Sequence, residues 1–146
     1  MSLEQTLLHE PNRSYLIADC ENLVRSEVSK KTGLSGLAVK GAFAFVQRLN
    51  PSFVNSAINL LINEFVQQLA PFYDHFQQSH HTRLQDFLNE NADAVSSALL
   101  QTTDARMRNA ENRSLKKAYE KLRPTGKKHV ESALPGIAHI LEKYVS

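Results

Sequence analysis

The chain has 146 residues and a formal net charge of +2, with 42% hydrophobic and 22% charged residues. This length suits a single domain, residues 1–146, and the composition is that of a soluble globular protein rather than a disordered or fibrous one. No stretch is apolar enough to span a membrane, and the first residues lack the basic flank and apolar core of a secretory signal.

Apolar residues recur at helical spacings of three and four from the start of the chain. One stripe lies within residues 16–28 and a second within residues 39–49, which ends at Leu49. Ser2 and Gln5 have the spacing of a capping box, in which each side chain bonds the other residue's backbone N–H. Gly41 interrupts the second stripe and predicts a close crossing with another helix.

The clearest helical pattern follows in residues 54–76, where seven apolar residues are spaced 4, 3, 4, 4, 3 and 4 positions apart. Asn50-Pro51 predicts the start of this third helix, and Pro71 predicts a kink or a break in it. Four amides share one side of it: Asn55, Asn59, Asn63 and Gln67. Uncharged side chains at these positions favour a helix largely enclosed by the domain, with a groove for a polar ligand as the alternative.

Shorter stripes lie within residues 95–100 and 115–122, and a longer one within 130–144. Connections are predicted near residues 109–112 and 123–126. Pro135-Gly136 interrupts the last stripe, but the apolar spacing continues through it, which favours a kinked helix over a loop. The chain is therefore predicted to be all-α, a single compact bundle of about six or seven helices with a long central third helix and a kinked C-terminal helix.

Charge is concentrated in residues 106–128, which carry nine Lys or Arg and two acids, whereas residues 1–105 carry seven bases and eleven acids. A local positive field favours an anionic partner. We expect a non-enzymatic binding module with a basic edge at 106–128, whose partner is an acidic protein, a phospholipid surface or a nucleic acid. The predicted anion-binding residues are Arg113, Lys117, Lys121, Arg123, Lys127 and Lys128.

Three alternatives to this function stay open. The basic segment can be a solvated face that pairs with the acidic remainder of the same fold. It can also belong to a structural or homo-oligomeric protein whose basic edge pairs with an acidic surface of a neighbouring subunit. A weaker alternative is a carrier of an apolar small molecule, suggested by seven Phe and by the low charge of residues 49–73.

Two predicted helix starts have the backbone N–H groups and lysines that suit an anion. The second candidate anion site comprises Lys30, Lys31, Gly33 and Ser35, and residues 125–128 form a similar start. Neither has the glycine and lysine spacing of a phosphate-binding loop. In the simpler interpretation these glycines only let the chain turn.

No motif for catalysis, metal binding or a cofactor is present. The six histidines lack the spacing of a metal site, and Cys20 lies in the apolar stripe of the first helix, where a thiol is buried and inert. We therefore expect no enzyme, no metal and no cofactor. A lone cysteine forms no intramolecular disulfide, which favours a cytoplasmic protein.

Four blocks of the sequence resemble a family of small, all-helical bacterial proteins of unknown function. The blocks are residues 2–8, 31–40, 103–106 and 118–135. The resemblance covers most of the chain and implies a compact helical domain. It implies no activity, cofactor or site residue.

Overall fold

A computed structural model describes residues 2–145, apart from the side chain of Ser35. Within these residues the chain forms seven helices and no strand. They are α1 (Leu3–Leu8), α2 (Asn12–Lys30), α3 (Gly33–Leu49), α4 (Phe53–Gln78), α5 (Leu84–Glu90), α6 (Ala92–Arg108) and α7 (Arg113–Val145). The prediction of an all-α bundle of six or seven helices is confirmed. Every helix in residues 2–145 is too short or too polar to cross a membrane.

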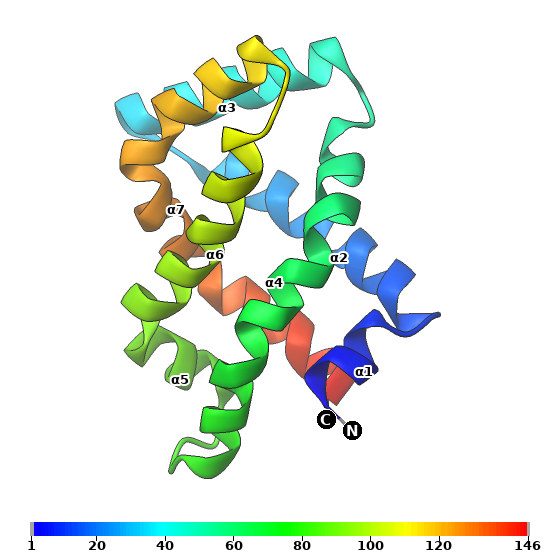
Figure 1. Cartoon of the computed structure of the whole chain (residues 1–146). Helices are drawn as coiled ribbons and strands as arrows, with labels where there is room; N and C mark the ends of the chain where they lie inside the picture. The colour runs from blue at the N-terminus through cyan, green and yellow to red at the C-terminus, as the bar shows by residue number, and fades with distance from the viewer. Residues whose placement is uncertain (1, 146) are drawn as a thin grey trace.

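The long helix α4 runs through the middle of the molecule, as predicted (Figure 1). Figure 1 shows α5, α6 and the first half of α7 on one side of it and α1 and the start of α2 on the other. The red second half of α7 passes behind α4 and ends near α1, and α3 lies across one end beside the first half of α7. The long helix is fourth in chain order because the capping box opens a separate short helix, α1. Gln5 donates its backbone N–H to Ser2 Oγ over 3.1 Å, and Ser2 donates its own to Gln5 Oε1 over 3.0 Å.

Helix α4 starts at Phe53 rather than at the predicted Pro51. It continues through Pro71 without a break, which excludes one of the two predicted outcomes, a break, and leaves the other, a kink, as a prediction. Its amide side is also exposed rather than enclosed. The amides hold α2 instead, since Arg13 donates to the side-chain oxygens of Asn59 and Asn63 over 3.3 and 3.4 Å.

Helix α7 is a single element of 33 residues that contains both Pro124 and Pro135. The loop predicted at residues 123–126 is therefore wrong. The predicted kink of the C-terminal helix is confirmed, because α7 changes direction between its orange and red parts in Figure 1. Gly136, directly after Pro135, lets α7 approach α2 closely, since an added Cβ would overlap Leu23 Cδ1.

The core lies where α1, α2, α4, α5, α6 and α7 meet. Its most deeply buried side chains are Leu7, Leu16, Leu84, Leu88, Leu134, Val66 and Val95. Helix α3 contributes no large side chain to this core, and Leu49 at its end is 57% exposed, contrary to the stripe predicted for it. Gly41 marks no helix crossing, because an added Cβ there would meet nothing within 4 Å.

Two glycines of α3 provide a matched test of how this helix joins α2. An added Cβ at Gly36 would lie 2.7 Å from the backbone carbon of Lys31, so we expect Gly36→Ala to destabilise the fold by about 1–3 kcal/mol. Gly41→Ala is expected to stabilise it by about 0.5–1 kcal/mol, because alanine favours helix and the site is open. Urea denaturation measures both values, and equal effects would contradict the close α2–α3 corner.

Candidate functional site

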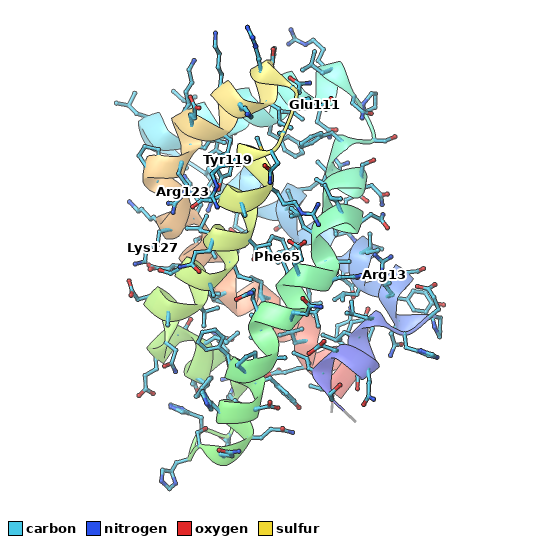
Figure 2. The ribbon with its side chains drawn as sticks, viewed as in Figure 1. Arg13, Phe65, Glu111, Tyr119, Arg123 and Lys127 are labelled. Carbon is cyan, nitrogen blue, oxygen red and sulfur yellow. The ribbon has the colours of Figure 1, made fainter. Side chains whose placement is uncertain are left out.

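A cavity of about 450 Å³ lies between α2, α4, α6 and α7, with one residue of α3 on its wall. Its lining is almost entirely apolar, and Figure 2 shows one lining side chain, Phe65, among the helices in the middle of the molecule. The apolar residues around it include Leu16, Cys20, Leu23, Val24, Val28, Val39, Ile58, Ile62, Phe65, Val66, Leu69, Leu99, Leu100, Leu122, Val130, Ala133, Ile137, Ile140 and Leu141. Stripes from four helices thus surround a space that their own side chains leave open.

The polar side chains on the wall are mostly paired with one another. Lys31 Nζ lies 3.6 Å from Glu27 Oε2, and it donates to Ser132 Oγ over 3.3 Å. Elsewhere on the wall, the hydroxyls of Thr103 and Tyr119 form a hydrogen bond with each other over 2.8 Å. In these pairs the polar side chains of the wall bond other side chains, so the remaining surface of the cavity is apolar.

His129 is the exception on this wall. Its Nε2 atom is cut off from solvent and is the only such side-chain nitrogen or oxygen without a hydrogen-bond partner in the described part of the chain. Burial and the nearby Lys31 and Lys128 charges lower the pKa of His129 from its ordinary value of 6.5. The imidazole is therefore neutral at pH 7, and its Nε2 is a buried polar atom that residues 2–145 leave without a hydrogen bond.

Cys20 also lines the cavity. Burial, with the nearby Asp19 carboxylate, raises the pKa of its thiol to about 11. The thiol is therefore protonated at neutral pH, which agrees with the inert cysteine expected from the sequence.

The structure divides the six residues predicted to bind an anion. Arg123 and Lys127 face α6, where Arg123 Nε donates to Asp104 Oδ1 over 2.8 Å and Lys127 pairs with Asp93. Figure 2 shows Tyr119, Arg123 and Lys127 along the seam between α6 and α7. The hydrogen bond from Arg123 lowers the pKa of the Asp104 carboxyl, against the opposing effect of burial. These two cations link α7 to α6.

The other four residues of the predicted set point outward. Arg113, Lys117, Lys121 and Lys128 are exposed, and none of them forms an ion pair with any residue in 2–145. The first three are spaced four residues apart in α7 and share one side of it. We call these four residues the basic ridge.

The structure gives different results for the two helix starts that were predicted to bind an anion. Residues 125–128 lie inside α7 and not at a helix start, so that prediction is wrong. Gly33 does open α3, with a φ of +74°, but Lys30 and Lys31 both lie within 4 Å of Glu27. The side chain of Ser35 lies outside the described residues. The second site therefore has less free charge than its sequence suggests.

The histidines are not gathered into a metal centre. Within residues 2–145 no three His, Cys, Asp or Glu side chains lie close enough to hold an ion. His81 pairs instead with Glu90 and packs edge-on against the Phe87 ring, with the ring centroids 5.8 Å apart. This contact fixes the turn between α4 and α5.

Sequence reasoning missed the cavity wall and the position of His129. Apolar spacing identifies which side of a helix faces inward, but it does not report whether four such sides meet without a gap. One signal was available, since Gly126 places a residue without a side chain beside Leu100 on the wall.

Comparison with known proteins gave a match at the level of family alone. Residues 3–145 match the sequence model of a family of unknown function, DUF6918. No curated protein and no solved structure matches the chain. Because the match spans nearly every residue, this all-helical chain belongs to the family of unknown function DUF6918.

Proposed function

We propose that the protein binds and carries an apolar small molecule in the cavity between α2, α4, α6 and α7. The observation that carries this proposal is the size and chemistry of the cavity, about 450 Å³ with apolar walls. Small-molecule sites in proteins typically enclose about 300–1,000 Å³ behind mainly apolar side chains. An apolar cavity of roughly 150 Å³ already takes up benzene, so this one has room for about three times as much ligand.

The energy of an empty cavity supports an occupant. The cavity is only partly enclosed, so its apolar walls face water when no ligand is bound. Apolar surface in contact with water costs about 25 cal/mol per Å² relative to burial. Water is a poor filling, because nearly every wall atom is apolar and offers it no hydrogen bond. An apolar ligand removes this cost by contacting the same walls.

The polar end of the ligand follows from His129. Its buried Nε2 has no partner in residues 2–145, and a buried polar atom left unpaired costs about 1–3 kcal/mol. The His129 ring lines the cavity, but Nε2 itself is covered, so a ligand hydroxyl, carbonyl or carboxyl oxygen would satisfy it once the ring turns towards the cavity. We therefore propose a single-chain amphiphile, such as a fatty acid, with its head at His129 and its chain among the leucines of α2, α4 and α7.

Two measurements test this function. Native mass spectrometry of the protein as purified is expected to show an adduct of a few hundred daltons, which organic extraction removes. The extracted protein is then expected to bind the fluorescent fatty acid cis-parinaric acid with one-to-one stoichiometry and saturation. An extracted protein that gives no saturable fluorescence would show that the cavity does not bind amphiphiles.

A second candidate function is the binding of an anionic partner by the basic ridge, as the sequence predicts. Its support is that Arg113, Lys117, Lys121 and Lys128 are exposed without an intramolecular counter-charge in residues 2–145. A ridge that only solvated the fold would not need to concentrate like charges, which disfavour a helix by a few tenths of a kcal/mol per pair. In this proposal, as in the first, the protein acts in the bacterial cytoplasm as a non-enzymatic binding module.

Charge reversal tests the ridge. Lys117→Glu/Lys121→Glu is expected to weaken binding of a fluorescent polyphosphate at least tenfold and to flatten its dependence on salt, because two phosphate contacts are lost. Fluorescence anisotropy at several salt concentrations measures this effect. Arg83→Glu reverses an exposed cation at the N-terminus of α5 and is compared with the single variant Lys117→Glu, since each changes the net charge by about two units. Equal weakening in both variants would contradict a specific role for the ridge.

A further inference from the structure

Helix α3 presents an apolar stripe to the solvent. Leu34 is 88% exposed and Leu37 is 69% exposed, followed by Phe45 at 42% and Leu49 at 57%. With Gly41, these residues are spaced 3, 4, 4 and 4 positions apart, so they share one side of the helix along its full length. The opposite side, with Phe43, turns inward. Large exposed apolar patches of this kind mark sites of association.

The charges that α3 itself carries are all of one sign. Residues 28–63 contain no Asp or Glu at all. Lys40 and Arg48 flank the stripe, are exposed, and form no ion pair with any described residue. An amphipathic helix with apolar residues and basic flanks is the type that lies flat in a membrane interface.

The position of α3 adds to this charge. The helix packs against α7, and Figure 1 shows it at one end of the molecule beside the first half of α7. That half carries Arg113, Lys117 and Lys121 of the basic ridge. The end of the molecule that exposes the apolar stripe is therefore also its most cationic end.

We propose that α3 docks the protein on an anionic lipid surface. Its leucines and Phe45 would enter the boundary between headgroups and acyl chains, with Lys40 and Arg48 on the headgroup phosphates. Charge complementarity selects this occupant, since two copies of the chain meeting at α3 would bring like charges together. A nucleic acid would meet the charges, but aliphatic side chains give its bases no stacking surface. The proposal does not depend on the cavity being filled.

Vesicle co-sedimentation of the full chain tests the proposal. Wild type is expected to sediment with vesicles of equimolar phosphatidylcholine and phosphatidylglycerol, and to stay in solution with vesicles of phosphatidylcholine alone. Leu34→Ser/Leu37→Ser is expected to weaken binding at least tenfold, because both side chains lose their burial in the interface. Since both leucines are exposed, the variant is expected to fold, and its circular dichroism and melting temperature check this.

A matched pair of variants tests whether vesicle binding depends on the stripe itself or on any exposed leucine. Leu49 and Leu60 are each 57% exposed, but Leu60 belongs to α4 and lies off the stripe. Leu49→Ser is expected to weaken vesicle binding, and Leu60→Ser is expected to leave it unchanged. Equal effects in this pair would overturn the proposal, as would equal binding to both kinds of vesicle. A concentration-dependent dimer without vesicle binding would assign the stripe to a second copy and also overturn it.

Binding of cis-parinaric acid in the same variants keeps this proposal distinct from the carrier function. Variants of the stripe lie outside the cavity lining, so their one-to-one binding of the probe is expected to match wild type. Loss of vesicle binding with intact probe binding supports the docking surface, whereas wild-type vesicle binding in Leu34→Ser/Leu37→Ser overturns it.

Discussion

Val66→Phe is expected to weaken binding of cis-parinaric acid at least tenfold and to leave the free protein as stable as wild type, or more stable. Val66 is 1% exposed and lines the cavity, so the larger ring enters open space and takes the volume of the ligand. A buried ring in empty space also gains contacts that valine does not make. Fluorescence titration measures the affinity, and urea denaturation measures the free energy of unfolding.

Val95 provides the control for this substitution. It is also fully buried, at 0% exposure, but it does not line the cavity. Val95→Phe is therefore expected to destabilise the fold by about 1–3 kcal/mol through overpacking. If Val66→Phe caused an equal loss of stability, the space beside Val66 would be closed and the carrier function would fail with it.

His129→Leu is expected to stabilise the free protein by about 1 kcal/mol and to weaken fatty acid binding about three- to tenfold. The first effect follows because the variant removes a buried nitrogen without a partner in residues 2–145, and the second because the ligand loses one hydrogen bond. Binding of an alkane of similar length is expected to stay unchanged. His139→Leu, at an exposed position of the same helix, is the control for both readouts.

The pH dependence of His129 has a definite sign. Its pKa is lowered in the fold from 6.5, so the unfolded chain binds the proton more readily. The free energy of unfolding therefore falls as pH drops through about 6.5, and it levels off below the lowered pKa. His129→Leu is expected to remove this slope. A slope that persists in full would show that another group causes it.

The sequence was sufficient for the helical class and for most helix positions, because apolar side chains at intervals of three and four leave little choice of structure. It was insufficient at Pro124 and Gly126, where the rule that these residues end helices predicted a loop. In the structure α7 continues through both, since Lys127 and Arg123 on either side are tied to α6. Packing against a neighbouring helix outweighed the local preference.

The candidate site was harder to predict from the sequence than the fold. A prediction of six anion-binding cations assumed that charges close in sequence act together, whereas the rotation of α7 turned Arg123 and Lys127 towards acids of α6. The sequence predicted an inward stripe within residues 39–49, of which Val39 does line the cavity but Leu49 is 57% exposed. Residues 34–49 are apolar on both sides of that helix, so periodicity alone could not say which side the bundle buries.

The two prolines of α7 affect where this helix can open locally. A helix usually frays from its ends, but α7 lacks the backbone bonds that residues 124 and 135 would donate, and its C-terminal turns are held by the core. The segment between the prolines, where His129 and Ala133 line the cavity, is therefore held by fewer backbone bonds than a regular stretch of helix. Small fluctuations of this segment would give a guest molecule a passage to the interior.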